Sequence, residues 1–143
     1  MNQQGPRAAE CLNALLRVEL AAVLAYHHAL RSLDGRLGSD SAQVLGLAAG
    51  HQRNVAALQA CIRALGAVPA AEPGASWSSF ALLRDKLSVR QLLDAEKDGL
   101  AEYVAALPFL DAENRELVES ELVPRQRQHV ATLSRILSEL PPA

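Results

Sequence analysis

The chain has 143 residues, of which half are hydrophobic and only 3% are aromatic. This length suits one domain with a single core, and the alanine- and leucine-rich composition favours packed helices over a sheet, which needs more β-branched and aromatic residues. The formal net charge of −2 gives no electrostatic basis for binding nucleic acid or an acidic membrane surface.

The amino terminus and the cysteines bear on location. Residues 1–10 lack the basic start and apolar core of a signal peptide, and no apolar run approaches the roughly 20 residues that span a bilayer. We therefore expect a cytoplasmic protein with no membrane contact. Cys11 and Cys61 are then expected to be small core or boundary side chains, with a disulfide between them as the lesser alternative.

Two helices are predicted in the first half of the chain. The first begins after Pro6 and covers about 7–33. The second covers about 40–66, and Gly66 offers a left-handed cap at its end. The short connection between them, DGRLGS, makes the two helices antiparallel neighbours.

A segment rich in proline, glycine and serine follows over about 67–87 and ends in a predicted short helix over about 77–87. This crossover is long enough to travel the length of a helical bundle. The third long helix is predicted over about 88–107, with Ser88 and Gln91 forming a capping box at its start.

The last helix is predicted over about 112–140, with Asp111 as its N-cap. Pro124 lies inside it, removes a backbone hydrogen bond and predicts a kink. Residues 1–143 are therefore predicted to form one all-α domain, a four-helix bundle of two antiparallel hairpins joined by a long crossover, which is the ferritin-like arrangement.

Each predicted long helix carries a polar residue in the middle of its apolar stripe, and these residues are Glu19, His51, Glu96 and His129. A carboxylate buried alone costs several kcal/mol even after the protein relaxes. The four residues must therefore satisfy one another or hold a cation. Carboxylate and imidazole groups from facing helices are the ligands of iron and manganese sites in helical bundles.

The first helix, LNALLRVELAAVLAYHHAL, resembles that of the ferritin-like superfamily, in which a glutamate is followed seven residues later by a tyrosine. Glu19 and Tyr26 occupy these positions, and the resemblance to bacterioferritin- and rubrerythrin-type bundles covers nearly the whole chain. Details such as IRALGAVP are more similar to small bacterial bundles of this superfamily than to cage-forming ferritins. The resemblance implies a ferritin-like fold and a role in metal handling or stress response.

The chain departs from the superfamily at two metal-binding positions. The second and fourth helices of the superfamily each carry Glu-x-x-His, whereas this chain has Ala48 before His51 and Gln126 before His129. The remaining four ligands would suit one ion of iron, manganese or zinc and are a poor basis for two. Alanine cannot bridge metals, which argues against dinuclear oxygen activation, and we assign the chain no enzymatic activity.

The register of the last two helices places Glu96 level with about Val123. At roughly 1.5 Å per residue, His129 would be displaced from Glu96 by roughly 9 Å along the helix axis. In that register Gln126 or Glu119 lies nearer to Glu96. The secondary candidate ligands are Gln126, Glu119, Tyr26 and Tyr103.

Other polar side chains are assigned to the core or the surface. Tyr26 and Tyr103 are expected to be core rings whose hydroxyl groups contact the buried polar residues. The side chains expected at the solvated surface are His27, His28, Arg125 and Arg127.

Two functions remain open. The first is a ferritin-like protein with a degenerate site for one metal ion. The second is a metal-free bundle that keeps its polar core for packing specificity and acts as a structural or protein-interaction module. A homodimer is plausible for this fold, whereas the sequence identifies no small-molecule partner.

Overall fold

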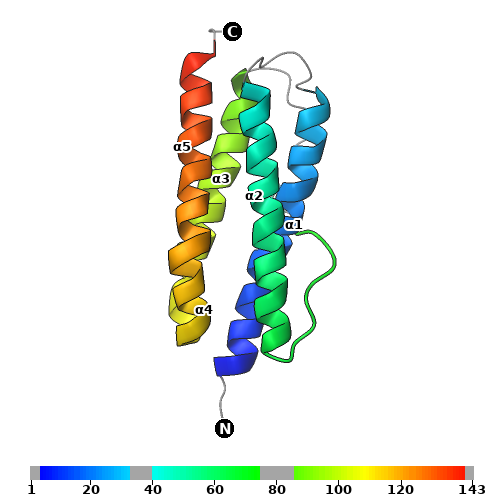
Figure 1. Cartoon of the computed structure of the whole chain (residues 1–143), viewed down its shortest axis with the longest axis vertical. Helices are drawn as coiled ribbons and strands as arrows, with labels where there is room; N and C mark the ends of the chain where they lie inside the picture. The colour runs from blue at the N-terminus through cyan, green and yellow to red at the C-terminus, as the bar shows by residue number, and fades with distance from the viewer. Residues whose placement is uncertain (1–3, 33–39, 75–85, 141–143) are drawn as a thin grey trace.

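The computed structural model describes residues 4–32, 40–74 and 86–140, and this part of the chain is mostly helical. Its long helices are α1 (Gln4–Ser32), α2 (Asp40–Ala64), α3 (Lys86–Ala106) and α5 (Val123–Glu139). They lie side by side as an all-α four-helix bundle (Figure 1), the predicted fold class. None of the described helices is both long enough and apolar enough to cross a membrane.

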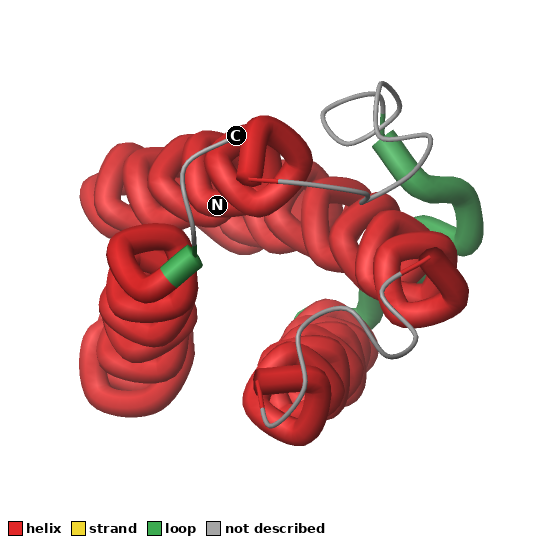
Figure 2. The backbone as a smooth tube through the Cα atoms, turned by 90° about the horizontal axis from the view of Figure 1, so that it is seen from above, coloured by secondary structure: helices red, strands yellow, loops and turns green. Residues whose placement is uncertain are grey.

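The helix order is that of two hairpins joined by a long crossing. In Figure 1, α2 and α3 both run from the top of the bundle to the bottom, so their connection must return along its length. The first part of the connection, residues 65–74, lies against α1, where the Gly74 N–H donates to the Arg17 carbonyl at 2.9 Å. The helix predicted over 77–87 falls largely outside the described residues. Seen end-on, the helices surround a common core (Figure 2).

The end of α2 agrees with the prediction. Gly66 has a φ of +79°, in the left-handed region that glycine adopts at little steric cost. Its N–H donates to the Arg63 carbonyl at 2.9 Å, and the N–H of Ala67 donates to the Ile62 carbonyl at 3.1 Å. These two bonds form a Schellman motif, which satisfies carbonyl groups at the helix end.

The ends of α3 differ from the prediction. The chain is already helical at Lys86, so Ser88 lies inside the helix and is not the N-cap of a capping box with Gln91. After Ala106 the chain continues as a 3₁₀ turn, η1 (Leu107–Phe109). The proline in this turn lacks the N–H that a continuing α-helix would need.

The predicted cap at Asp111 is confirmed. Its side chain accepts hydrogen bonds from the backbone N–H of Asn114 at 3.4 Å and from Asn114 Nδ2 at 2.7 Å. The helix that follows consists of three consecutive segments, α4 (Ala112–Leu117), the π-helix η2 (Val118–Leu122) and α5. The π-helix ends at Leu122, two residues before Pro124, and the Val123 N–H donates to the Val118 carbonyl, so the missing proline N–H is accommodated by i→i+5 bonding.

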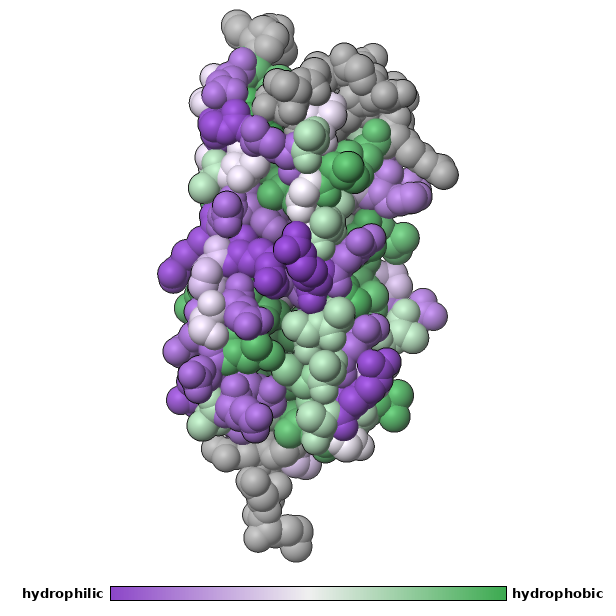
Figure 3. Space-filling view, in the orientation of Figure 1, coloured by the Kyte–Doolittle hydropathy of each residue, from purple (hydrophilic) through white to green (hydrophobic). Residues whose placement is uncertain are grey.

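The core consists of two apolar clusters separated by a buried polar layer. One cluster is built around Tyr26, Val44, Leu92 and Ile136, and the other around Leu12, Leu58, Tyr103 and Leu122. The polar layer comprises Glu19, His51, Asn54, Glu96, Gln126 and His129, each less than 5% exposed. On the face shown in Figure 3, strongly hydrophilic side chains also gather at mid-height across α2 and α5.

Both cysteines are free thiols at half-buried positions. Burial raises the pKa of Cys11 and of Cys61, and nearby carboxylates, Glu102 for the first and Asp111 for the second, raise it further. Both thiols are therefore protonated and weakly nucleophilic near neutral pH.

We predict that Asp111→Ala lowers the free energy of unfolding by about 1 kcal/mol, because α4 loses its side-chain cap. Urea denaturation measures the change. Asp98→Ala is the control, since Asp98 is exposed in the middle of α3 and should change stability by less than about 0.5 kcal/mol. Equal effects of the two substitutions would contradict the cap.

Candidate metal centre

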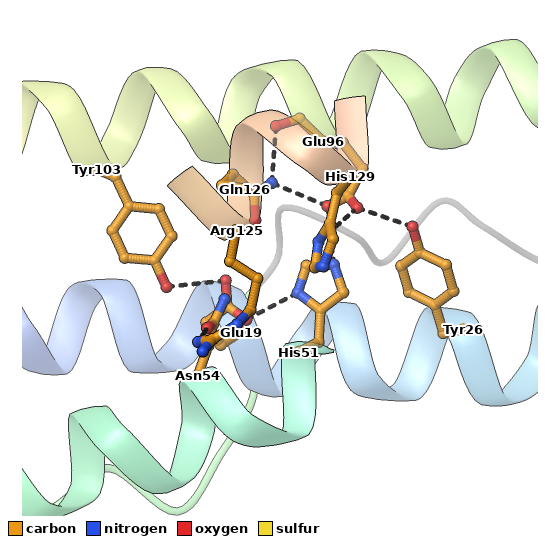
Figure 4. Close-up of polar contacts among 9 residues, drawn as sticks. All are labelled: Glu19, Tyr26, His51, Asn54, Glu96, Tyr103, Arg125, Gln126 and His129. Carbon is orange, nitrogen blue, oxygen red and sulfur yellow. Dashed lines mark hydrogen bonds and ion pairs between the residues drawn. The ribbon is translucent and has the colours of Figure 1, made fainter. Parts of the chain in front are cut away.

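Each of the four long helices contributes a buried polar side chain to the same level of the bundle (Figure 4). Glu19 comes from α1, His51 from α2, Glu96 from α3 and His129 from α5. The structure therefore brings together the four residues that the sequence nominated as metal ligands.

His51 lies between two carboxylates. Its Nδ1 is 2.7 Å from Glu19 Oε2, and its Nε2 is 2.8 Å from Glu96 Oε1. The other oxygen of Glu19, Oε1, accepts a hydrogen bond from the Tyr103 hydroxyl at 3.0 Å. Glu19 and Glu96 thus contact different nitrogens of the same imidazole ring.

Glu96 makes contacts with all three other helices of the bundle. In addition to His51, its Oε1 accepts a hydrogen bond from Gln126 Nε2 at 2.9 Å. Its Oε2 accepts one from the Tyr26 hydroxyl at 2.8 Å and lies 3.2 Å from His129 Nδ1. The Gln126 amide also donates to the backbone carbonyl of Glu96 at 2.9 Å.

The two tyrosines are related by the antiparallel packing of α1 and α3. Tyr26 follows Glu19 by seven residues, and Tyr103 follows Glu96 by the same spacing. Each hydroxyl donates to the glutamate of the opposite helix, which confirms the prediction of core rings bound to the polar residues. Burial, reinforced by the carboxylates, raises the pKa of both tyrosines, so both hydroxyls remain protonated donors.

The buried charges of the polar layer stabilise one another. Burial disfavours the charged form of His51, but the attraction of Glu96 and Glu19 outweighs it and raises the pKa of His51 to about 10. Burial likewise opposes ionisation of Glu96, yet His51 and His129 hold the pKa of Glu96 well below its usual range. In the metal-free state, His51 and Glu96 therefore form a buried ion pair.

Two glycines make room for the polar side chains of α5. A Cβ at Gly50 would lie 2.5 Å from His129 Nε2, and one at Gly99 would lie 3.2 Å from Gln126 Nε2. Neither glycine is among the residues that the sequence nominated for the site. A glycine inside a helix destabilises it by about 1 kcal/mol relative to alanine. A glycine within a predicted helix can therefore indicate close packing against a neighbour, and the sequence did contain this signal.

The predicted register of the last two helices is wrong. Glu96 contacts His129 directly, whereas the register placed it level with Val123. A 3₁₀ turn advances farther per residue than an α-helix, and a π-helix advances less, so η1 lengthens one arm of the hairpin and η2 shortens the other. Of the two residues that this register brought nearer to Glu96, Gln126 does contact it, whereas Glu119 is exposed on η2.

Two residues near the layer were also missed. Asn54 is fully buried and accepts a hydrogen bond from Arg125 Nη1 at 2.7 Å. The prediction that Arg125 lies on a solvated face is therefore wrong, because its side chain is half-buried, whereas Arg127 is exposed as predicted. Asn54 follows His51 by three residues on the same helical face, so helical periodicity could have found it.

Within the described part of the chain, the group with the geometry of a metal site is His51, Glu96 and His129, whose ligand atoms lie within 4.8 Å of one another. Glu96 faces the two imidazoles through different oxygens, with Oε1 2.8 Å from His51 Nε2 and Oε2 3.2 Å from His129 Nδ1. Each contact is close to the separation of about 3 Å expected between neighbouring ligands of one ion. Two histidines and one carboxylate are also a donor set typical of non-haem iron. The residues present therefore fit a single transition-metal ion.

Gln126 Oε1 adds an independent observation. It is a buried acceptor with no hydrogen-bond partner among the described residues, next to this group on α5. Leaving a buried polar atom unpaired costs about 1–3 kcal/mol, and such an atom is common where a ligand completes the site.

No protein-family model matches the chain, and no curated protein matches it either. A ferritin-like diiron-carboxylate protein from Bacillus anthracis is similar with a TM-score of 0.79 and 18% identity, covering 96% of this chain and 99% of that one. The bacterioferritin of Desulfovibrio desulfuricans has a TM-score of 0.83 and 19% identity, with coverage of 96% and 84%. The bacterioferritin of Rhodobacter capsulatus has a TM-score of 0.79 and 22% identity, covering 93% of this chain and 84% of that one. The chain therefore has the ferritin-like fold that the resemblance implied.

We predict that Gly50→Ala lowers the free energy of unfolding by about 1–3 kcal/mol, although alanine favours helix, because its methyl group would collide with His129. Gly46→Ala is the matched control one turn earlier in α2, where nothing lies within 4 Å of the added methyl group. It should raise stability by about 0.5–1 kcal/mol. Stabilisation by both substitutions in urea denaturation would show that the close packing is absent.

The His51 ion pair predicts a pH dependence for protein stripped of metal by a chelator. Because the pKa of His51 is about 10 in the fold and 6.5 without it, the stabilisation is fully present below pH 6.5 and is lost as the pH rises through about 10. The free energy of unfolding, measured across this window, should fall more steeply for the natural chain than for His51→Gln. Parallel profiles would exclude the ion pair.

Proposed function

We propose that this chain binds one divalent transition-metal ion, iron in the first instance, with His51, Glu96 and His129 as its ligands. The observation that carries the proposal is the approach of one donor atom from each of three helices to within 4.8 Å of the others, in a layer shielded from solvent. A bound ion would supply a Lewis-acid or redox centre with coordination positions left open.

Glu19 has a supporting role in this proposal. Because its Oε2 lies 2.7 Å from His51 Nδ1, a neutral His51 would donate the Nδ1 proton to Glu19 and direct the Nε2 lone pair toward Glu96 and His129. Tyr103 holds the other Glu19 oxygen in place. The ligand set nominated from the sequence thus becomes three ligands and one carboxylate that orients a ligand.

The site is proposed to hold one ion because two carboxylates are missing. Ala48 offers no ligand, and the amide nitrogen of Gln126 faces Glu96 as a donor. Structures of similar fold are described as a diiron-carboxylate protein and as bacterioferritins with diiron or dinuclear sites, which supports iron as the first ion to test. A role in metal handling or stress response rests on fold similarity alone.

The second candidate function, a metal-free structural or protein-interaction module, is favoured by the ion pair itself. Each nitrogen of the His51 ring lies within ion-pair distance of a carboxylate, 2.7 Å from Glu19 and 2.8 Å from Glu96, so a protonated His51 has its charge paired without a metal ion. Metal binding must then displace a proton from His51, which lowers affinity as the pH falls. A cytoplasmic location and a homodimer remain predictions under either function.

Metal analysis decides between the two functions. The chain, purified without an affinity tag and loaded anaerobically with Fe(II), should retain about one ion per chain after desalting. A His51→Ala/His129→Ala double variant should retain none. His27→Ala/His28→Ala is the control, because these histidines are exposed on α1, and it should bind as the natural chain does.

Circular dichroism confirms that each variant is folded. Absence of metal from every sample would support the metal-free function. Two ions per chain, or an equal content in the double variant, would contradict the proposed ligand set.

A further inference from the structure

A groove of about 380 Å³ lies between α2 and α5 and reaches the metal-ligand group. The buried residues Gly50 and His129 contribute to its lining, together with Arg53 and Arg125. In Figure 3 this is the face on which hydrophilic side chains gather at mid-height. Its volume is at the lower end of the range for small-molecule sites, about 300–1,000 Å³.

Two contacts between α5 and α2 lie on either side of Gly50 and His129 along the groove. Arg125 donates to Asn54 on one side, and Arg135 donates to Gln43 on the other. Arg135 is also paired with Glu139, so its charge is neutralised. The part of the groove between these two contacts is lined by Gly50 and His129.

The lining is positively charged, although the whole chain has a formal net charge of −2. It includes Arg53 and Arg125 but no aspartate or glutamate among the described residues. Arg53 has no ion-pair partner in the described part of the chain, and Arg125 bonds to the neutral amide of Asn54. Two guanidinium groups beside one groove, with no carboxylate to neutralise them, favour an anionic ligand.

His129 connects the groove with the metal-ligand group. Its Nδ1 faces Glu96 at 3.2 Å, whereas its Nε2 faces Gly50 in the groove lining. When Nδ1 acts as a metal ligand, Nε2 carries the ring proton and becomes a hydrogen-bond donor on the groove side. Gly50 leaves room for this side of the ring, because a Cβ at position 50 would lie 2.5 Å from His129 Nε2.

We propose that the groove binds a small oxyanion, a carboxylate or phosphate group, through Arg53 and Arg125 beside the metal centre. The forked N–H donors of a guanidinium match the oxygen pairs of both groups. In this proposal Asn54 is a positioning residue, since it accepts a hydrogen bond from Arg125 at 2.7 Å. The proposal deepens the proposed function, on which it rests for the link to the metal, while the anion contacts belong to the groove itself.

Isothermal titration of the full chain with malonate and with inorganic phosphate tests the proposal, first without metal. Malonamide, which has a similar size but no charge, is the ligand control. Arg53→Gln and Arg125→Gln should each weaken anion binding by about tenfold, the loss of one charge-assisted contact. Arg63→Gln and Arg127→Gln, exposed on the same helices but outside the groove lining, should leave it unchanged.

Tighter binding of malonate supports an organic acid as the ligand, and tighter binding of phosphate supports a phosphate-bearing one. In the cobalt-loaded chain, a change in the visible absorption on adding the anion shows that it reaches the metal environment. If the chain binds an anion but retains no metal, the proposed metal-binding function is overturned and the anion site stands. Failure of both anions to bind, or an equal loss of affinity in all four arginine variants, would overturn the anion site.

Discussion

The structure depends on one buried carboxylate, Glu96, which is fully shielded from solvent at the centre of the bundle. Such a group is tolerated only when its charge is paired and its oxygens are hydrogen-bonded. The partners come from every other long helix: Tyr26 from α1, His51 from α2, and Gln126 with His129 from α5. Satisfying this one group therefore constrains the height of all four helices relative to one another.

Several departures from regular packing follow from that constraint. The apolar core is divided into two clusters. Positions 50 and 99 are glycines, although other residues favour helix more, because a Cβ there would lie too close to His129 and Gln126. The π-helix η2 ends about one turn before Gln126 and about two turns before His129. An apolar layer of the same volume is often at least as stable as buried ions, so stability alone does not explain the layer. The proposed metal site provides a functional reason for it.

The sequence was sufficient to predict the helices, the caps at Gly66 and Asp111, and the convergence of the buried residues, because each leaves a local signal. Helix-to-helix register was not predictable in the same way. It depends on how η1 and η2 change the rise per residue, and the sequence shows the prolines there without showing which distortion they produce. The partner of Arg125 was missed for a related reason, since Asn54 lies on another helix.

Anomalous diffraction from crystals of the iron-loaded chain, recorded at the iron edge, tests the central claim most directly. The structure predicts one peak in the polar layer, about 2.0–2.2 Å from donor atoms of His51, Glu96 and His129, with Glu19 still bonded to His51 Nδ1. A pair of peaks, a peak coordinated by Glu19 in place of His51, or no peak in the layer would contradict a mononuclear site built on these three residues.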